Sequence, residues 1–145
     1  MSRTIVRRTI DAPADFVFRT VAEIENYSKA IPHIVDVEFL SDVRSGVGSR
    51  FRETRLMMGR EASTILEVTE YVENDRVRIV SDEGGTIWDS VFTVSPVDGG
   101  TELTLVMDAA PYTFKSKILT PVMKLVIRMG LVKDMDAVKE YCESS

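Results

Sequence analysis

The chain has 145 residues and a formal net charge of −5 at pH 7, with 44% hydrophobic and 28% charged residues. This balance is typical of a folded globular protein and argues against disorder, and the length predicts one domain spanning residues 1–145. The acidic balance argues against nucleic acid as a partner, because binding to phosphates needs a basic face. The N-terminal stretch lacks the apolar core of a signal peptide, and the single cysteine, Cys142, cannot form an internal disulfide. We therefore expect a cytoplasmic location.

The first 32 residues predict one strand followed by two short helices. Residues 4–10 have the composition of a strand, and the stretch DAPADFVFRTVAEI after them has the features of a helix start. Pro13 suits the first turn and Asp15 favours the positive end of the helix dipole. The stretch IENYSKAIP predicts a second short helix, which Pro32 ends.

Six extended segments follow, separated by five turns rich in glycine, asparagine and aspartate. These residues tolerate the positive φ that tight hairpins need. In the segments, apolar and polar residues alternate with period two, which indicates antiparallel strands with one buried face. The segment 50–58 is ambiguous, because neither of its two faces is cleanly apolar. The turns lie at residues 45–48, 58–60, 73–76, 83–85 and 98–100.

A long helix is predicted near the C-terminus, over residues 118–141. Lys124, Arg128 and Lys133 interrupt its apolar residues, so a transmembrane segment is not expected. On a helical period, the apolar side chains of residues 118–129 spread over about 200°, and those of residues 131–142 are centred about 160° away. Because a straight helix could not point both sets at one sheet, we predict a kink or break near Gly130. The wide arc is compatible with a buried core, a dimer contact or the wall of a cavity.

This order of elements predicts an α+β fold, and the local strings resemble a known family. The chain resembles the START-like, Bet v 1-like (SRPBCC) superfamily, and within it the polyketide cyclase/dehydrase and lipid-transport branch. The resemblance implies a helix-grip fold, in which a curved seven-stranded antiparallel sheet surrounds a long C-terminal helix and two short helices follow strand 1. It also implies an apolar ligand held between the sheet and the helix. The strings are IDAP with FVF, IENYSKAIPHIVDVEFL, GVGSRFRE, EVTEYVENDRVRI, GGTELTL and DMDAVKEYCE.

The residue types do not predict a catalytic triad, a metal site or a cofactor. His33 is the only histidine and is far in sequence from Cys142, so a nucleophile paired with a histidine base is not expected. One histidine and one cysteine cannot form an ordinary zinc site. The glycines occupy hairpin turns and not a phosphate-binding loop between a strand and a helix.

Ten residues are candidates for contact with a ligand. Trp88, Ser90 and Phe92 share one strand face, and Arg52 could bind a carbonyl or carboxylate through its planar guanidinium. For three candidates a structural role is the first interpretation: His33 as a residue of the helix–strand junction, Arg52 as an exposed residue and Met107 as core. Trp88 could be either core or a flat wall for a ring. The candidates are Tyr27, His33, Arg52, Thr54, Trp88, Ser90, Phe92, Met107, Tyr112 and Met123.

Three hypotheses for the function follow. The first is binding or carriage of a hydrophobic small molecule, such as a lipid, a polyketide or a quinone. The second is an enzyme resembling aromatic polyketide cyclases, in which a few polar groups move protons. The third is a protein-interaction module whose C-terminal helix forms a homodimer contact.

Overall fold

The computed structural model describes residues 2–145, and its elements follow the predicted order. One antiparallel sheet contains seven strands in the spatial order β1-β7-β6-β5-β4-β3-β2. The predicted α+β class and helix-grip architecture are confirmed, including the two short helices after the first strand. The elements are β1 (Ser2–Ile10), α1 (Ala14–Ala22), α2 (Ile24–Ala30), β2 (Ile34–Phe39), β3 (Arg50–Met57), β4 (Arg60–Val72), β5 (Arg76–Glu83), β6 (Thr86–Val97), β7 (Gly100–Pro111), α3 (Phe114–Val122) and α4 (Lys124–Glu143).

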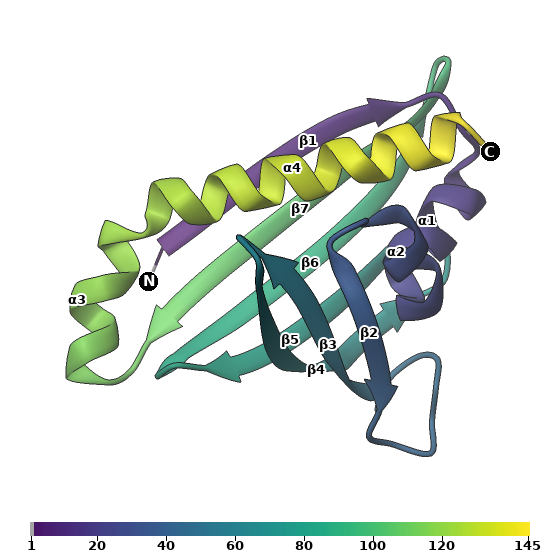
Figure 1. Cartoon of the computed structure of the whole chain (residues 1–145). Coiled ribbons are helices and arrows are strands. Elements are labelled where there is room, and N and C mark those ends of the chain that lie inside the picture. The colour runs from purple at the N-terminus through teal and green to yellow at the C-terminus, as the bar shows by residue number, and fades with distance from the viewer. Residues whose placement is uncertain (1) are drawn as a thin grey trace.

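The sheet is strongly curved, and α4 runs beside β1 and across the inner side of the sheet (Figure 1). Two bulges, between Ile34 and Asp36 and between Val68 and Glu70, interrupt the strand pairing. Bulges bend a strand and increase its twist, and here they lie in β2 and β4, in the part of the sheet that curls forward. Helices α1 and α2 close one end of the sheet, and α3 lies at the other end (Figure 1).

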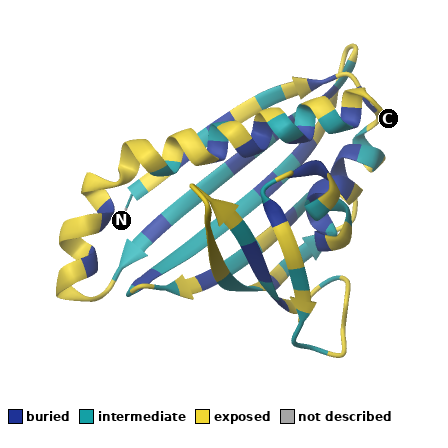
Figure 2. Ribbon diagram, viewed as in Figure 1, coloured by how far each residue is buried: buried dark blue, intermediate teal, exposed yellow. Residues whose placement is uncertain are grey.

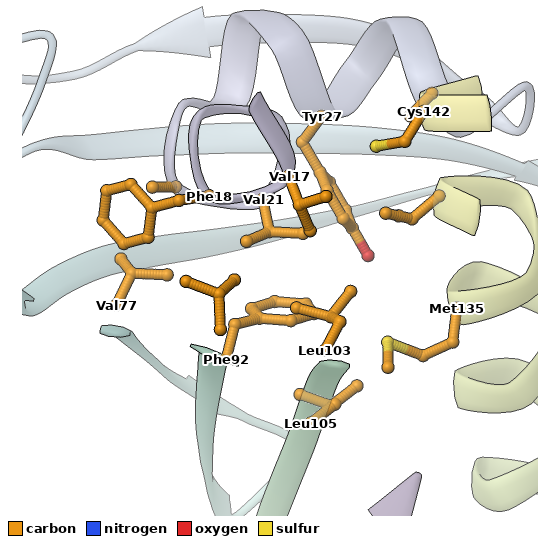
Figure 3. Packing of buried hydrophobic residues seen from close by; sticks show 14 of the residues in the cluster. Val17, Phe18, Val21, Tyr27, Val77, Phe92, Leu103, Leu105, Met135 and Cys142 are labelled. Atoms are coloured by element: carbon orange, nitrogen blue, oxygen red, sulfur yellow. The ribbon is translucent and has the colours of Figure 1, made fainter. Parts of the chain in front are cut away.

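The packed core lies at the end closed by α1 and α2. Figure 3 shows side chains of α1 and α2 meeting those of β5, β6, β7 and α4. Phe18 is fully buried and packs edge-on against Tyr71, and Tyr27 packs edge-on against Phe92. Burying a side chain of this size stabilises the fold by about 2–3 kcal/mol, so this end holds the sheet and helices together.

The predicted break at Gly130 is wrong, since α4 continues through Gly130 without interruption from Lys124 to Glu143. The break lies at Met123, between α3 and α4, two residues after Pro121. Proline has no backbone N–H and so removes one hydrogen bond from the helix interior. The N–H of Met123 is shared between the carbonyls of Leu119 at 3.0 Å and Thr120 at 3.2 Å, a tightening that is common where a helix ends.

The prediction of a break assumed that both apolar sets, in residues 118–129 and in residues 131–142, face the protein. In the structure only the second set does so, through Leu131, Met135 and Val138. The apolar side chains before Gly130 point mainly to solvent, and Figure 2 shows α3 and the first half of α4 exposed. A straight helix is therefore compatible with the sequence.

Candidate functional site

The inner face of the sheet forms a wall that the helices cover only in part. Strand register places Ile79, Ser90 and Met107 side by side, and Ser81, Trp88 and Ala109 in the next row. Of these, Ile79, Trp88, Ser90 and Met107 remain half-buried, although they face the side on which α4 lies. A wall of apolar side chains that keeps contact with solvent offers a surface to an apolar ligand.

A cavity of about 340 Å³ lies next to this wall, between α3 and the adjoining ends of β5 and β6. Its lining combines apolar residues with hydroxyl groups from Thr86, Ser116 and Thr120 and with the charged residues Glu83 and Lys115. The apolar lining residues include Trp88, Leu119, Met123 and Ile127. A larger space of about 670 Å³ beside α4 is lined by residues 31–33 and by residues of α4 that are mostly exposed, so we regard it as a surface groove.

Four polar side chains meet between β3, α2 and α4. Asp134 of α4 accepts hydrogen bonds from Nη1 of Arg55 at 3.0 Å and 2.9 Å, and its Oδ2 is 3.4 Å from the Tyr27 hydroxyl. Arg55 also donates through Nε to Glu53 at 2.5 Å. The Glu53 and Asp134 side chains are each 10% exposed and that of Arg55 is 25% exposed. This polar cluster of Tyr27, Glu53, Arg55 and Asp134 ties the first strands of the curled sheet to the C-terminal helix.

The environment of the polar cluster controls the protonation of two of its members. Burial by itself lowers the pKa of Arg55, but the charges of Glu53 and Asp134 outweigh it and raise the pKa above its ordinary value. Burial raises the pKa of Tyr27 well above 10.0, and the negative charge of Asp134 raises it further. The cluster therefore holds a charged guanidinium and a neutral phenol at physiological pH.

We expect Tyr27→Phe to reduce the loss of stability at alkaline pH. The pKa of Tyr27 is raised in the folded protein. The contribution of Tyr27 to the free energy of unfolding is therefore fully present below pH 10 and is lost as the pH rises through the folded pKa. Between pH 8 and pH 11 the free energy of unfolding should fall by about 1 kcal/mol less in the variant than in the unmodified protein. Urea unfolding at the two pH values measures this. Tyr141→Phe is the control, since Tyr141 is only half-buried and lies outside the polar cluster; an equal effect of both substitutions would contradict the prediction.

The structure brings six of the ten candidate residues to the inner side of the fold. Phe92 lies on the inner face of β6 with Trp88 and Ser90, and Met107 is their neighbour on β7. Phe92 is buried in the core. Met123 lines the cavity beside Trp88. Tyr27 is buried and belongs to the polar cluster.

The other four candidates lie elsewhere. The register of β3 places Arg52 and Thr54 on the opposite face from Arg55, because successive side chains of a strand alternate. There Arg52 forms an ion pair with Glu38, and Thr54 shares a 2.8 Å hydrogen bond with Ser63.

His33 lines the surface groove beside α4, and its backbone carbonyl accepts a hydrogen bond from the N–H of Leu56 at 2.8 Å. Tyr112 is exposed after the end of β7, where its hydroxyl donates to Asp82 at 2.7 Å. These four residues do not belong to the inner wall.

Sequence reasoning missed Glu53, Arg55 and Asp134. Two signals pointed to them. Phe51 lies on the same strand face as Glu53 and Arg55. Where neither face of a strand is cleanly apolar, the face that carries the aromatic side chain is favoured as the buried one. Asp134 lies three residues after Leu131 and four before Val138, so it belongs to the buried side of the helix, where a carboxylate needs a partner.

Neither a metal site nor a membrane-spanning helix is found among the described residues. Within residues 2–145, no three or more His, Cys, Asp or Glu side chains are grouped so that they could hold a metal ion. None of the helices in that range is long and apolar enough to cross a membrane.

Comparison with known proteins agrees with the fold and defines the family. Similar solved structures include a START superfamily protein from Mycobacterium smegmatis, with 18% identity, a TM-score of 0.76 and coverage of 98% of this chain and 97% of that one. TTHA0849 from Thermus thermophilus has 19% identity and a TM-score of 0.76, with 96% and 95% coverage. The di-domain ARO/CYC StfQ from the steffimycin biosynthetic pathway has 13% identity and a TM-score of 0.79, covering 98% of this chain and 50% of StfQ.

At these identities the structural similarity concerns the fold alone. No curated protein sequence matches the chain significantly. The model of the family described as polyketide cyclase/dehydrase and lipid transport matches residues 1–143. The chain therefore belongs to this family.

Proposed function

We propose that the protein binds a hydrophobic small molecule against the inner face of its sheet. The observation that carries this proposal is the half-open apolar wall: Ile79, Trp88 and Met107 face inward from three adjacent strands, yet none of them is fully buried. Leaving apolar area in contact with water costs about 25 cal/mol per Å². A ligand that covers this wall recovers that free energy.

The chemistry of the wall indicates the class of ligand. Trp88 offers a flat surface to a ring or a conjugated chain, and the flexible thioethers of Met107 and Met123 adapt to different apolar shapes. Single hydroxyl groups, from Ser90 and Thr86, can donate to a carbonyl oxygen. A polyketide, a quinone or a lipid chain with a carbonyl head fits this combination.

We expect a hydrophobic ligand to change the fluorescence of Trp88, the only tryptophan in the chain. Titrations with oleate and with decylubiquinone test two ligand classes, and mass spectrometry of a solvent extract of freshly purified protein, compared with a mock purification, tests for a ligand already bound. Ser90→Phe should weaken binding about tenfold or more, because it fills space in front of the wall.

The matched control for this experiment is Val91→Phe, which adds the same aromatic ring at the neighbouring residue on the opposite face of β6. Binding by this variant should equal that of the unmodified protein. A blank extract together with unchanged fluorescence in both titrations would contradict the proposal. Equal loss of binding in both variants would argue that the ligand does not lie against the inner wall.

A second candidate function, cyclisation of a polyketide chain, is favoured by the polar cluster. Arg55 keeps its charge and lies beside a neutral tyrosine and two carboxylates, so the cluster could stabilise an enolate oxygen and exchange protons with a bound chain. The test is product formation from a linear poly-β-ketone thioester. Arg55→Gln should abolish cyclisation and Arg52→Gln, on the outer face of the same strand, should not; equal activity of both variants would remove Arg55 from this role.

A further inference from the structure

Helix α3 is amphipathic, but it buries polar side chains and exposes apolar ones. Its two buried residues, Ser116 and Thr120, are polar. The Ser116 hydroxyl donates to the Gly85 carbonyl at 2.7 Å, and Thr120 shares a 3.1 Å hydrogen bond with Thr86. Its apolar side chains point outward instead, with Phe114 at 82% and Val122 at 75% exposed. A surface helix of a globular protein normally shows the opposite arrangement.

The first half of α4 continues this outward apolar surface. Leu131 and Met135 face the core, and the large side chains on the other side of the helix before Gly130 are each more than 60% exposed. From Asp136 onward the outer side is charged, so the surface ends near the middle of α4. We call the exposed apolar set on these two helices the docking face; it consists of Phe114, Ile118, Val122, Leu125, Val126 and Met129.

The charge around the docking face has the opposite sign to that of the chain. Residues 109–133 contain five basic residues and no aspartate or glutamate, although the whole chain has a net charge of −5. No ion pair within residues 2–145 involves any of these five. Cations therefore flank an exposed apolar surface without intramolecular carboxylate partners. They are Lys115, Lys117, Lys124, Arg128 and Lys133.

We propose that the docking face binds the surface of a membrane that contains anionic phospholipids. An apolar helix face flanked by Lys and Arg is the combination that inserts at the boundary between headgroups and acyl chains, and juxtaposed lysines are attracted by the negative surface potential of anionic lipids. A second copy of the chain fits less well, since a two-fold contact through this face would bring the same cations together.

The position of the docking face gives it a relation to the cavity. Leu119 of α3 and Met123, which follows α3, line the cavity beside Trp88. Ile118 and Val122 of α3 belong to the docking face. Docking thus places the cavity within one helix diameter of the lipid surface. This last step rests on the proposed ligand binding; membrane docking itself does not.

Cosedimentation with vesicles tests the proposal. The protein is mixed with vesicles of phosphatidylcholine alone or with about 30% phosphatidylserine, at low and at high salt. Binding should require phosphatidylserine and weaken with salt. Val122→Glu/Val126→Glu should abolish it, and Lys115→Gln/Lys117→Gln should reduce the partition coefficient about tenfold or more. All four positions are exposed, so the fold should tolerate these changes.

Matched controls change the same residue types elsewhere on the surface. Val47→Glu/Val97→Glu alters two exposed valines outside α3 and α4, and Arg7→Gln/Lys29→Gln removes two exposed cations; both should bind as the unmodified protein does. Absence of binding to phosphatidylserine vesicles would overturn the proposal, as would equal loss in the control variants. A dimer in sedimentation velocity that Val122→Glu/Val126→Glu dissociates, without vesicle binding, would assign the face to a second copy. Ligand titration followed by Trp88 fluorescence, without vesicles, tests ligand binding independently of membrane docking.

Discussion

Asp134→Ala is expected to lower the free energy of unfolding by about 2–4 kcal/mol. Asp134 is buried on α4 and accepts two hydrogen bonds from Arg55 of β3, and the Tyr27 hydroxyl of α2 lies 3.4 Å away. Removing one partner of a buried ion pair costs about 3–5 kcal/mol, because the other charge stays desolvated. Here the cost is at the lower end, since Arg55 keeps Glu53 and is partly exposed.

Urea unfolding measures this effect, with Asp136→Ala as the matched control. Asp136 lies two residues further along the same helix and pairs with Arg8 at the surface, where an ion pair contributes about 0–1 kcal/mol. Equal destabilisation by both substitutions would contradict our interpretation of the polar cluster. A triple variant, Glu53→Leu/Arg55→Met/Asp134→Leu, should be more stable than Asp134→Ala, because it leaves no unpaired charge at this position.

Gly100→Ala is expected to lower the free energy of unfolding by about 3–5 kcal/mol. Gly100 begins β7 with φ at +147°, and a Cβ there would lie 2.1 Å from the carbonyl oxygen of Ile10 and 3.1 Å from the Cα of Asp11. Both are backbone atoms at the end of β1, so the strand itself must move. Forcing extra atoms into such a contact costs about 1–3 kcal/mol or more, and the left-handed backbone adds about 1–2 kcal/mol.

The neighbouring Gly99 supplies the control for this prediction. It also has a positive φ, of +82°, but a Cβ there would meet no atom within 4 Å. Gly99→Ala should therefore cost only about 1–2 kcal/mol, the backbone contribution alone. Thermal or urea unfolding gives the loss of stability in each variant. The difference between the two losses measures the cost of the steric contact at Gly100. A Gly100→Ala variant no less stable than Gly99→Ala would show that β1 can shift away from β7 at little cost.

Local patterns were sufficient for the architecture. Turn residues at 73–76 and 98–100, and period-two alternation between them, predicted the strands, since both signals depend on neighbours along the chain. Pro32 and the helical stripe after Pro13 predicted the two short helices for the same reason. The order of these elements was enough to indicate the α+β class and the family.

Tertiary structure decided which faces point inward and which residues meet. Both faces of β3 mix polar and apolar residues, so the sequence does not say which face is buried. Only the pairing of β3 with β2 and β4 in the folded sheet places Arg55 inside and Arg52 outside. Asp134 and Arg55 are 79 residues apart, and no local pattern relates them. The straight course of α4 was missed because periodicity locates an apolar face but does not say whether protein or solvent lies against it. Burial is a property of the packed fold, and on α3 and α4 it leaves the apolar face uncovered.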